Sequence, residues 1–500
     1  MKNATSSSYL CVIDEGTTSS RALLFDGSGN LLAMTQEDIQ QYYPKPGWVE
    51  HSPQEIWESV LKNMKALFQK TSLTPKDILG LGITNQRETT ILWERATGKP
   101  IYPAIVWQDR RNSALCEAWI REGHEPVISR KTGLLLDPYF SALKIHWILS
   151  EVPGAREKAE KGELAFGTMD TYLLWQLTGG RHHTTDITNA SRTLLFNIHT
   201  KTWDEELLSF FNIPFSLLPE VKENTAHFGD TLPPLFGGSI PIVAMMGDQQ
   251  AAAVGQACFS KGMIKSTYGT GCFMVLNTGK EVVSSKHRLL STVLYQIGNE
   301  VHYALEGSIF MAGAIIQWLR DEMKWIRESK DCEALAKEVK DNGGVYLVPA
   351  FTGMGAPYWD PLAKGAILGL TRDTKIPHIV RAALEAVCYQ TRDLLRAMEE
   401  EGIQVPSLRV DGGMTKNEWL LQCLADQLNR PILRSSWVET TALGIAYLIG
   451  VQRGLYEHGK DHEGLWREDK IFKPSKERAQ AEKDYEGWLK AVKQVVVSHV

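Results

Sequence analysis

Several features that would assign this chain to a common class of protein are missing from its sequence. Its seven cysteines are scattered and form no C-x-x-C pair, so they make neither a disulfide framework nor a zinc site. We expect reduced thiols and a cytoplasmic protein. No apolar run reaches the length of about 18 residues that a membrane span needs. Residues 1–8 are polar, so we expect neither a signal peptide nor an anchor there.

The chain also lacks a strong charge of one sign. Its formal net charge is −5, and no long basic block occurs, so we expect no nucleic-acid partner. Hydrophobic residues make up 43% of the chain and charged residues 23%, which is enough for a sizeable core. A length of 500 residues is too great for one core and predicts two large lobes or three smaller domains.

Common catalytic motifs are missing as well. The nearest match to the P-loop pattern is residues 454–460, but Asp461 stands where that pattern needs a metal-binding hydroxyl. No G-x-G-x-x-G follows an expected strand, and no H-E-x-x-H, G-x-S-x-G or zinc-spaced Cys/His set occurs. These absences exclude P-loop nucleotide hydrolysis, dinucleotide binding of the Rossmann type and zinc-dependent chemistry.

What is present begins with residues 9–26. An apolar run ends on Asp14, passes through a turn rich in Gly and hydroxyl groups, and resumes as a second apolar run, which predicts a β-hairpin. Backbone N–H groups and hydroxyls at such a tip can surround phosphate oxygens, and the carboxylate can hold Mg²⁺ through water. An ordinary solvated turn is the alternative. A third strand is expected over residues 31–37, and a capped helix over residues 53–70.

Polar residues follow an expected buried strand at residues 78–84. Arg87 and Glu88 lie just beyond its end, where open sheets bind ligands; a solvated ion pair is the alternative. A hairpin over residues 89–107 would bring Trp107 to the same side, and Tyr139 would open a helix. The pattern of residues 162–219 indicates no chemistry.

A second buried strand, residues 240–246, ends just before Asp248. An acid between a strand end and a helix N-terminus stays ionised and can accept a proton, although a helix-capping role is also open. Residues 265–276 then form a second hairpin with a Gly/Thr tip. Two such hairpins predict a duplicated βββαβα unit clasping a nucleotide, with domains at residues 1–257 and 258–500.

Further elements are expected in the second half. Residues 306–317 are predicted to form a helix of small residues, and residues 376–400 a long helix. Residues 408–417 predict a strand, a turn with paired glycines and a helix start. Glycines there would let the backbone approach a phosphate or a flat ligand closely, and a plain tight turn is the alternative.

These pieces, in this order, resemble the FGGY carbohydrate kinases, and among them the members that phosphorylate glycerol. Nine collinear stretches between Asp14 and Gly413 carry the resemblance, so that chance agreement is negligible. They are residues 14–21 (DEGTTSSR), 43–51 (YPKPGWVEH), 82–90 (GITNQRETT), 106–111 (VWQDRR), 137–140 (DPYF), 188–192 (TNASR), 247–250 (GDQQ), 268–273 (YGTGCF) and 410–413 (VDGG).

The resemblance implies an α/β protein with two duplicated lobes of the RNase H type, as in actin and hexokinase, and a nucleotide cleft between them. It implies ATP-dependent phosphorylation of glycerol to sn-glycerol 3-phosphate and ADP with Mg²⁺, in a homodimer or homotetramer. Asp248 would be the general base, and the metal-binding residues would be Asp14 and Asp248. The implied polyol-binding residues are Arg87, Glu88, Trp107, Tyr139, Asp248, Gln249 and Phe273. The implied nucleotide-binding residues are Thr17, Thr18, Ser19, Arg21, Thr270, Gly313, Gln317, Gly413 and Asn417.

The sequence departs from the family pattern in three places. Glu15 replaces the Gln that is frequent after the first Asp and could bring an extra negative charge close to the phosphates. The loop at residues 236–240 has no Arg, so we expect no inhibition by fructose 1,6-bisphosphate. Residues 232–235 have no His, so we expect no regulation by a phosphocarrier protein.

Two other functions fit parts of the pattern. A related kinase could act on a pentulose, although Arg87, Glu88, Trp107 and Phe273 favour a small triol. An ATP-driven binding or chaperone switch could share the fold, but no residues are left over for a peptide-binding domain.

Overall fold

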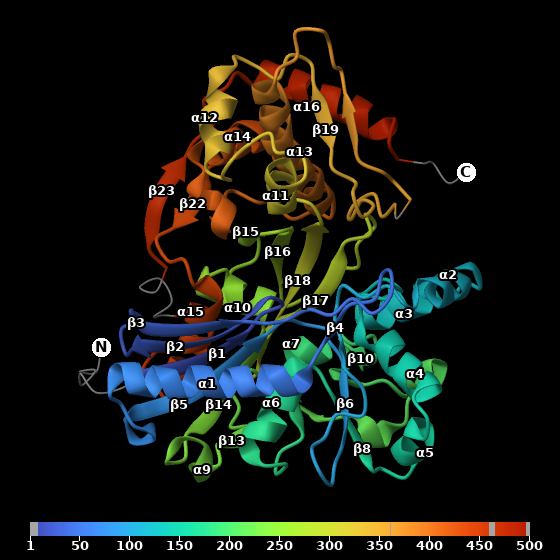
Figure 1. Ribbon diagram of the computed structural model, residues 1–500, viewed down its shortest axis with the longest axis vertical. Helices are drawn as coiled ribbons and strands as arrows, with labels where there is room; N and C mark the ends of the chain where they lie inside the picture. Colours follow the sequence, from blue (N-terminus) through green and yellow to red (C-terminus); the bar gives the residue numbers. More distant parts are fainter. Residues whose placement is uncertain (1–8, 361, 460–465, 497–500) are drawn as a thin grey trace.

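The computed structural model describes residues 9–360, 362–459 and 466–496. Lys460 and Asp461, which end the near match to the P-loop pattern, lie outside the described residues. Two mixed β-sheets form the centres of the two halves and are stacked one above the other in Figure 1.

The first sheet is built mainly from residues 9–85. Three consecutive strands form an antiparallel meander, and two strands that come later in the chain run parallel to the first. The strand order is β13-β14-β5-β1-β2-β3. The strands are β1 (Tyr9–Glu15), β2 (Ser19–Asp26), β3 (Leu31–Asp38), β5 (Ile78–Asn85), β13 (Gly229–Asp230) and β14 (Pro241–Gly247).

The second sheet repeats this arrangement. Its order is β17-β18-β16-β15-β21-β22-β23, and β15, β16 and β18 are antiparallel whereas β21 and β22 run parallel to β15. The run β3-β2-β1-β5-β14 therefore corresponds to β18-β16-β15-β21-β22, which confirms the predicted duplication. The strands are β15 (Ile264–Tyr268), β16 (Cys272–Gly279), β17 (Leu290–Ile297), β18 (Glu300–Ile309), β21 (Leu408–Asp411), β22 (Ile432–Ser435) and β23 (Glu468–Phe472).

Helices cover both sheets, and two of them lie between the sheets (Figure 1). On one face of the first sheet, Ile56 and Val60 of α1 pack against Cys11 and Ile13. On its other face, α10 and α15 share a core with β1 and also with β16 and β17 of the second sheet. The helices of the two halves are α1 (Pro53–Thr71), α6 (Met169–Thr178), α10 (Asp248–Gly255), α11 (Gly313–Asp321), α12 (Asp331–Glu338), α13 (Ile376–Glu400), α14 (Glu418–Leu428), α15 (Thr440–Gln452) and α16 (Arg478–Lys493).

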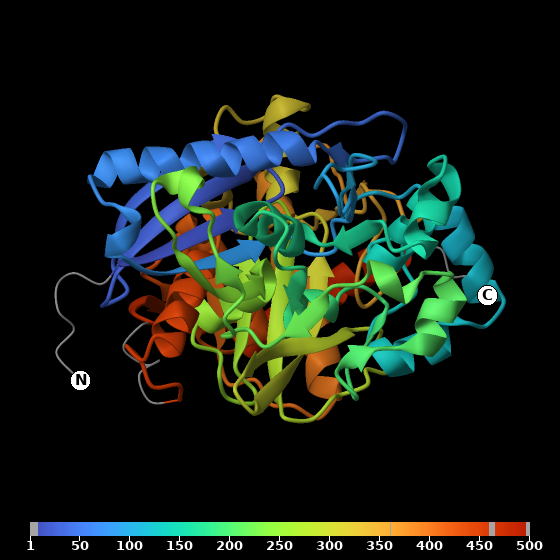
Figure 2. The same ribbon diagram turned by 90° about the horizontal axis from the view of Figure 1, so that it is seen from below.

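Residues 86–236 add a region of short elements. Its helices α2 to α5 gather beside the first sheet rather than over it, as Figures 1 and 2 both show. The helices are α2 (Ser113–Arg121), α3 (Glu125–Thr132), α4 (Ser141–Glu151), α5 (Ala155–Glu160), α7 (Ile187–Ala190), α8 (Glu205–Phe211) and α9 (Pro233–Phe236). The paired short strands, together with one pair in the second half, are β4 (Glu50–His51) with β7 (Ala104–Ile105), β6 (Ile91–Glu94) with β8 (Leu164–Gly167), β9 (Thr184–Asp186) with β12 (Glu220–Lys222), β10 (Phe196–Asn197) with β11 (Thr202–Trp203), and β19 (Tyr346–Val348) with β20 (Ala366–Leu368).

Most of the expected elements are confirmed, and one is wrong. The helix expected over residues 53–70 is α1, with the Ser52 hydroxyl capping the N–H of Glu55, and the helix expected over residues 376–400 is α13. The helix expected over residues 306–317 is instead the end of β18 followed by α11. Pairing of residues 306–309 with β16 decides this conformation, and the local pattern of small residues did not predict it.

Candidate active site

The first of the two hairpins predicted to bind phosphate is formed by β1 and β2. Asp14 is the second-last residue of β1, and Arg21 lies opposite it on β2. The Arg21 Nη2 is 2.6 Å from Asp14 Oδ2, and its Nη1 is 2.5 Å from Glu439 Oε2 at the start of α15. Burial raises the pKa of Asp14, and the guanidinium of Arg21 opposes that shift. Arg21 therefore joins the two halves at the base of the tip.

Residues of the tip itself are less buried. Thr18 is exposed, and Thr17 and Ser19 are partly exposed. The Gly16 N–H donates to the Ser19 carbonyl at 2.9 Å, and the Thr17 hydroxyl accepts a hydrogen bond from Trp107 Nε1 at 2.9 Å. The tip is thereby tied to an aromatic residue that the sequence placed near the substrate.

Glu15 does not add charge to this tip. Successive side chains of a strand point to opposite faces, and Cys11 and Ile13 of β1 pack against α1. The fully buried Glu15 side chain belongs to that face, whereas Asp14 belongs to the other. Burial raises the pKa of Glu15 well above its ordinary value, which favours the neutral acid.

The second hairpin tip, between β15 and β16, packs on the start of α11. The N–H groups of Ala312 and Ala314 donate to the Thr270 carbonyl, each at 3.0 Å, and the Gly313 N–H donates to the Gly269 carbonyl at 2.9 Å. A Cβ at Gly313 would lie 2.6 Å from that carbonyl oxygen. Only glycine allows this close approach.

A cavity of about 420 Å³ opens beside this second tip. It brings together all five of the nucleotide-binding residues that the sequence placed in the second half, whereas Thr17, Thr18, Ser19 and Arg21 do not line it. Sequence reasoning did not identify its other walls, in particular the stretch from Ser329 to Glu333. The lining residues are Tyr268, Gly269, Thr270, Gly313, Ile316, Gln317, Ser329, Lys330, Cys332, Glu333, Leu384, Gly413, Met414, Lys416 and Asn417.

Asp248 stands where β14 ends and α10 begins, as the sequence predicted. Its Oδ1 accepts from the Gln249 N–H at 2.7 Å and lies 3.4 Å from Arg87 Nε. Burial raises the pKa of Asp248, while the cations of Arg87 and Lys265 oppose the shift. The buried Lys265 ammonium donates to Gln249 Oε1 at 2.5 Å and so fixes the side chain next to Asp248. The sequence analysis did not identify Lys265 as a site residue.

Arg87 and Glu88 are not a solvated ion pair but two members of a buried group of four charges. Arg87 forms two bonds to Glu306, with Nη1 to Oε2 at 2.6 Å and Nη2 to Oε1 at 3.0 Å. Arg192 Nε donates to Glu88 Oε1 at 2.6 Å, and its Nη2 donates to Glu306 Oε1 at 2.9 Å. All four side chains are at most 2% exposed.

The charges in this group shift one another strongly. Burial alone would raise the pKa of Glu306, but the guanidinium groups of Arg192 and Arg87 lower it to about 2. Burial raises the pKa of Glu88, and the same two cations oppose that shift. Glu306 lies on β18 of the second sheet, so this group also links the two halves. Sequence reasoning missed Glu306 and Arg192 because the contacts join positions more than 100 residues apart.

Three aromatic rings stand together beside these charges. The Trp107 ring lies 5.5 Å from the Tyr139 ring and 6.2 Å from the Phe273 ring, centroid to centroid. Tyr139 lies two residues before α4 rather than within it. The predicted polyol-binding residues thus form one cluster, with apolar ring faces next to fixed polar groups. Small polar ligands are bound by this combination.

A divalent cation would find two carboxylates here. Asp14 and Asp248 are near enough for Asp14 to raise the pKa of Asp248, although no cluster of three or more potential metal ligands occurs in the described part of the chain. Mg²⁺ is usually held by one or two carboxylates together with water and substrate phosphates. This pair of oxygen donors fits such a site.

Comparison with known protein families decides the assignment. The N-terminal domain of the FGGY family of carbohydrate kinases matches residues 9–255, and its C-terminal domain matches residues 264–453. This chain belongs to the FGGY family of carbohydrate kinases. The predicted family and fold class are confirmed, while the exact domain boundary at residue 257 stays a prediction.

Relatives of this FGGY kinase include proteins named glycerol kinase. The protein from Ectopseudomonas mendocina is 57% identical over 98% of this chain and 99% of its own length, and that from Alteromonas mediterranea is 55% identical over 97% and 99%. The structure of Plasmodium falciparum glycerol kinase with ADP superposes with a TM-score of 0.91 at 36% identity, covering 98% of this chain and 99% of that one.

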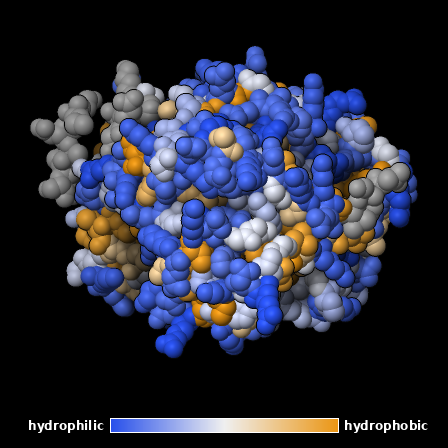
Figure 3. Space-filling view, turned by 90° about the horizontal axis from the view of Figure 1, so that it is seen from above, coloured by the Kyte–Doolittle hydropathy of each residue, from blue (hydrophilic) through white to orange (hydrophobic). Residues whose placement is uncertain are grey.

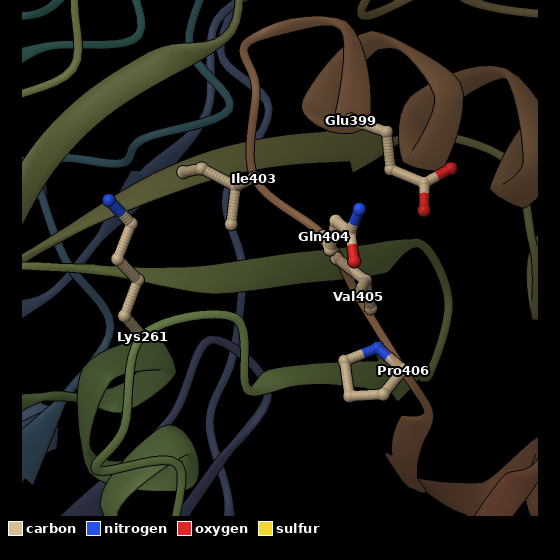
Figure 4. Close-up of a pocket in the computed structure, with 6 residues that line it drawn as sticks. All are labelled: Lys261, Glu399, Ile403, Gln404, Val405 and Pro406. Atoms are coloured by element: carbon tan, nitrogen blue, oxygen red, sulfur yellow. The ribbon is translucent and has the colours of Figure 1, made fainter.

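A second cavity of the FGGY kinase, of about 660 Å³, lies away from the cluster of predicted polyol-binding residues. Figure 4 shows Lys261 reaching it from the segment before β15, while the other lining residues come from the end of α13 and the loop after it. The Glu399 carboxylate there is bound by Arg430 Nη1 at 2.7 Å. None of the predicted polyol-binding residues lines this cavity.

Proposed function

We propose that this chain transfers the γ-phosphoryl group of ATP to glycerol, giving sn-glycerol 3-phosphate and ADP. The observation that carries the proposal is the 57% identity, over 98% of this chain, to a protein named glycerol kinase. The polyol cluster supports it, because Arg87, Glu88, Tyr139 and Asp248 place polar groups for hydroxyls beside the ring of Trp107.

Asp248 is the proposed general base. It stands at the end of a strand, and its carboxylate is only partly shielded from solvent (29% exposed). Burial raises its pKa, and the cations of Arg87 and Lys265 oppose that rise. A base must come within about 2.6 to 3.2 Å of the proton-bearing atom. In this role Asp248 accepts the proton of the attacking hydroxyl as the oxygen bonds to the phosphorus.

The other hydroxyls of glycerol would be held by Arg87 and Glu88. Each side chain is already held by a buried ion pair, Arg87 by Glu306 and Glu88 by Arg192. Neither side chain therefore needs to be ordered when substrate binds. Preorganised groups of this kind cost no rearrangement during the reaction. Trp107 and Phe273 would cover the C–H groups of the triol.

ATP would lie in the cavity beside Thr270, with its phosphates between the two hairpin tips. Phosphoryl transfer passes through a loose transition state, so the protein acts mainly by positioning and charge stabilisation. Mg²⁺ bound with ATP, held by Asp14 and Asp248, would neutralise charge on the phosphates. Thr17, Thr18, Ser19 and Arg21 are proposed to contact the phosphates from the first tip.

The location and assembly of the protein are part of the proposal. None of the helices within the described residues is long and apolar enough to cross a bilayer, and all seven cysteines are free thiols. We propose a cytoplasmic enzyme that forms a homodimer or homotetramer.

Identification of the product tests the proposed function. The purified chain is incubated with ATP, Mg²⁺ and glycerol, and the product is offered to a dehydrogenase specific for sn-glycerol 3-phosphate. We expect one equivalent of that product for each ADP formed. ADP formation without a phosphorylated glycerol, or with the other enantiomer, would reject the proposal.

A further inference from the structure

Residues 184–192 comprise β9, α7 and the turn that follows, and the reaction described above uses only Arg192 of this segment. Asp186 and Thr188 are fully buried. Asp186 caps the short helix α7, and its Oδ2 accepts from the Thr188 N–H at 2.7 Å. The Thr188 hydroxyl also donates to Asp186 Oδ2. The lone pairs of the Thr188 hydroxyl oxygen therefore remain available to accept another hydrogen bond.

That acceptor position is used by the strand that carries the base. The Gly247 N–H donates to Thr188 Oγ1 at 3.0 Å, and Gly247 immediately precedes Asp248. A Cβ at Gly247 would lie 2.8 Å from both Cγ and Cδ of Arg87. The backbone that Thr188 holds is thus packed against one polyol-binding residue and bonded to the proposed base.

The buried carboxylate does not depend on this hydroxyl to be satisfied. Asp186 also accepts from Asn189 Nδ2 at 2.6 Å and from Asn224 Nδ2 at 2.8 Å, in addition to the Thr188 N–H. With the Asn189 N–H, which donates at 3.4 Å, four other donors therefore already satisfy Asp186. The bond that only the Thr188 hydroxyl supplies is the one to Gly247.

The same loop reaches the site at two further points. Asn189 and Asn85 exchange a pair of amide hydrogen bonds, each 3.0 Å long, and Asn85 ends the strand that leads to Arg87. Arg192 binds Glu88. One buried segment therefore contacts Gly247 beside Asp248, Asn85 two residues before Arg87, and the side chain of Glu88.

We propose that Thr188, oriented by Asp186, is a positioning residue that holds Gly247 and so directs the carboxylate of Asp248 toward the attacking hydroxyl. This inference rests on the proposed function, since it assumes that Asp248 is the base. A displacement of about 1 Å in such a group can reduce the rate by about 10²-fold. Loss of the Thr188 hydroxyl should therefore lower kcat far more than it changes KM for glycerol.

Thr188→Val tests the inference, because valine keeps the shape of threonine and replaces only the hydroxyl with a methyl group. Thr185→Val is the matched control: Thr185 is also buried, and its hydroxyl donates to the neighbouring acid Asp170 at 2.7 Å, but it does not reach Gly247. Thr188→Ser keeps the hydroxyl. Glycerol phosphorylation and melting temperature are measured for all three variants and for the wild type.

We expect Thr188→Val to lower kcat by about tenfold or more, within the range for a misplaced catalytic group, with a smaller change in KM. Thr188→Ser should recover most of kcat, and Thr185→Val should keep it even where the melting temperature falls. Equal kcat values for Thr188→Val and wild type, or an equal loss in Thr185→Val, would overturn the inference. If Thr188→Val does not fold, Thr188→Ala must show the loss that Thr188→Ser does not. An inactive wild type would instead reject the proposed function.

Discussion

The carboxylate of Asp248 is hydrogen bonded only to its neighbour Gln249 among the described residues, while Arg87 and Lys265 hold positive charge close by. Most other acids of the cluster are fully engaged, Glu306 by two arginines and Glu88 by one. Asp248 is therefore the acid best able to take a proton from a substrate hydroxyl.

Asp248→Asn tests this role. The amide keeps the shape of the side chain but cannot act as a base, so kcat should fall by at least about 10²-fold while calorimetry shows glycerol binding largely unchanged. Asp38→Asn, at an exposed strand end, is the control and should keep full activity. Near-normal turnover in Asp248→Asn would remove Asp248 from the role.

Glu306→Gln tests the buried group of charges through stability. Removing one partner of a buried ion pair leaves the other uncompensated, so urea unfolding at pH 7 should show a loss of about 3 kcal/mol, the lower end of that class. Glu58→Gln on the exposed face of α1 should change stability little.

The loss of stability in Glu306→Gln should also depend on pH. The folded-state pKa of Glu306 is about 2, below its ordinary value of 4.5, so its contribution is present above about pH 4.5 and is lost as the pH falls toward 2. The difference in unfolding free energy between wild type and Glu306→Gln should therefore narrow over that range. A free-energy difference that stays constant between pH 4.5 and 2 would contradict the lowered pKa of Glu306.

At the level of elements, the crossing of α10 and α15 joins the two halves. A Cβ at Gly255 would lie 1.9 Å from the Thr440 carbonyl oxygen, and a Cβ at Gly444 would lie 2.0 Å from that of Ala251. The two backbones touch because both positions are glycine. Since Asp248 opens α10 and Glu439 precedes α15, this crossing also fixes where the base and the Arg21 partner lie.

Gly444→Ala should separate the two helices. Overpacking of this kind costs about 1 to 3 kcal/mol, so the melting temperature should fall. Gly413→Ala is the comparison for stability, because a Cβ there would meet no atom within 4 Å. Equal melting temperatures for Gly444→Ala and wild type would show that the helices can move apart freely.

Elements with local signals were predictable from the sequence. The Ser52 cap and the Pro53 start predicted α1, and buried strands ending on Asp14 and just before Asp248 predicted the positions of both acids. The end of β18 was misassigned because Gly307 and Ser308 carry no clear strand pattern, and only their pairing with β16 settles their conformation. The sequence alone does not contain that long-range pairing.

At the scale of the whole molecule, each half contributes a different part of the site. The first half supplies Arg87, Glu88, Trp107 and the base, whereas the cavity beside Thr270 belongs to the second. The face seen in Figure 3 is mostly hydrophilic, with hydrophobic residues in small separate groups. The sequence predicted the polyol-binding and the nucleotide-binding residues. It did not predict the ion pairs that join the two halves, since Arg87 and Glu306 are 219 positions apart.

This division predicts closure when both ligands bind. Most of the proposed contacts to glycerol lie in the first half, whereas the cavity proposed for ATP lies in the second. The two ligands together should therefore draw the halves inward and exclude water. Small-angle X-ray scattering should show a smaller radius of gyration with glycerol plus a non-hydrolysable ATP analogue than with either ligand alone. The same radius in all three samples would argue against closure.

The central claim is that this site is built for glycerol. The most direct test is a substrate panel in which glycerol and several pentuloses are each offered with ATP and Mg²⁺, and ADP formation gives kcat/KM for each. We expect glycerol to have the highest kcat/KM by a wide margin, because the proposed contacts of Arg87, Glu88, Trp107 and Phe273 favour a small triol. A pentulose with a higher kcat/KM than glycerol would contradict it.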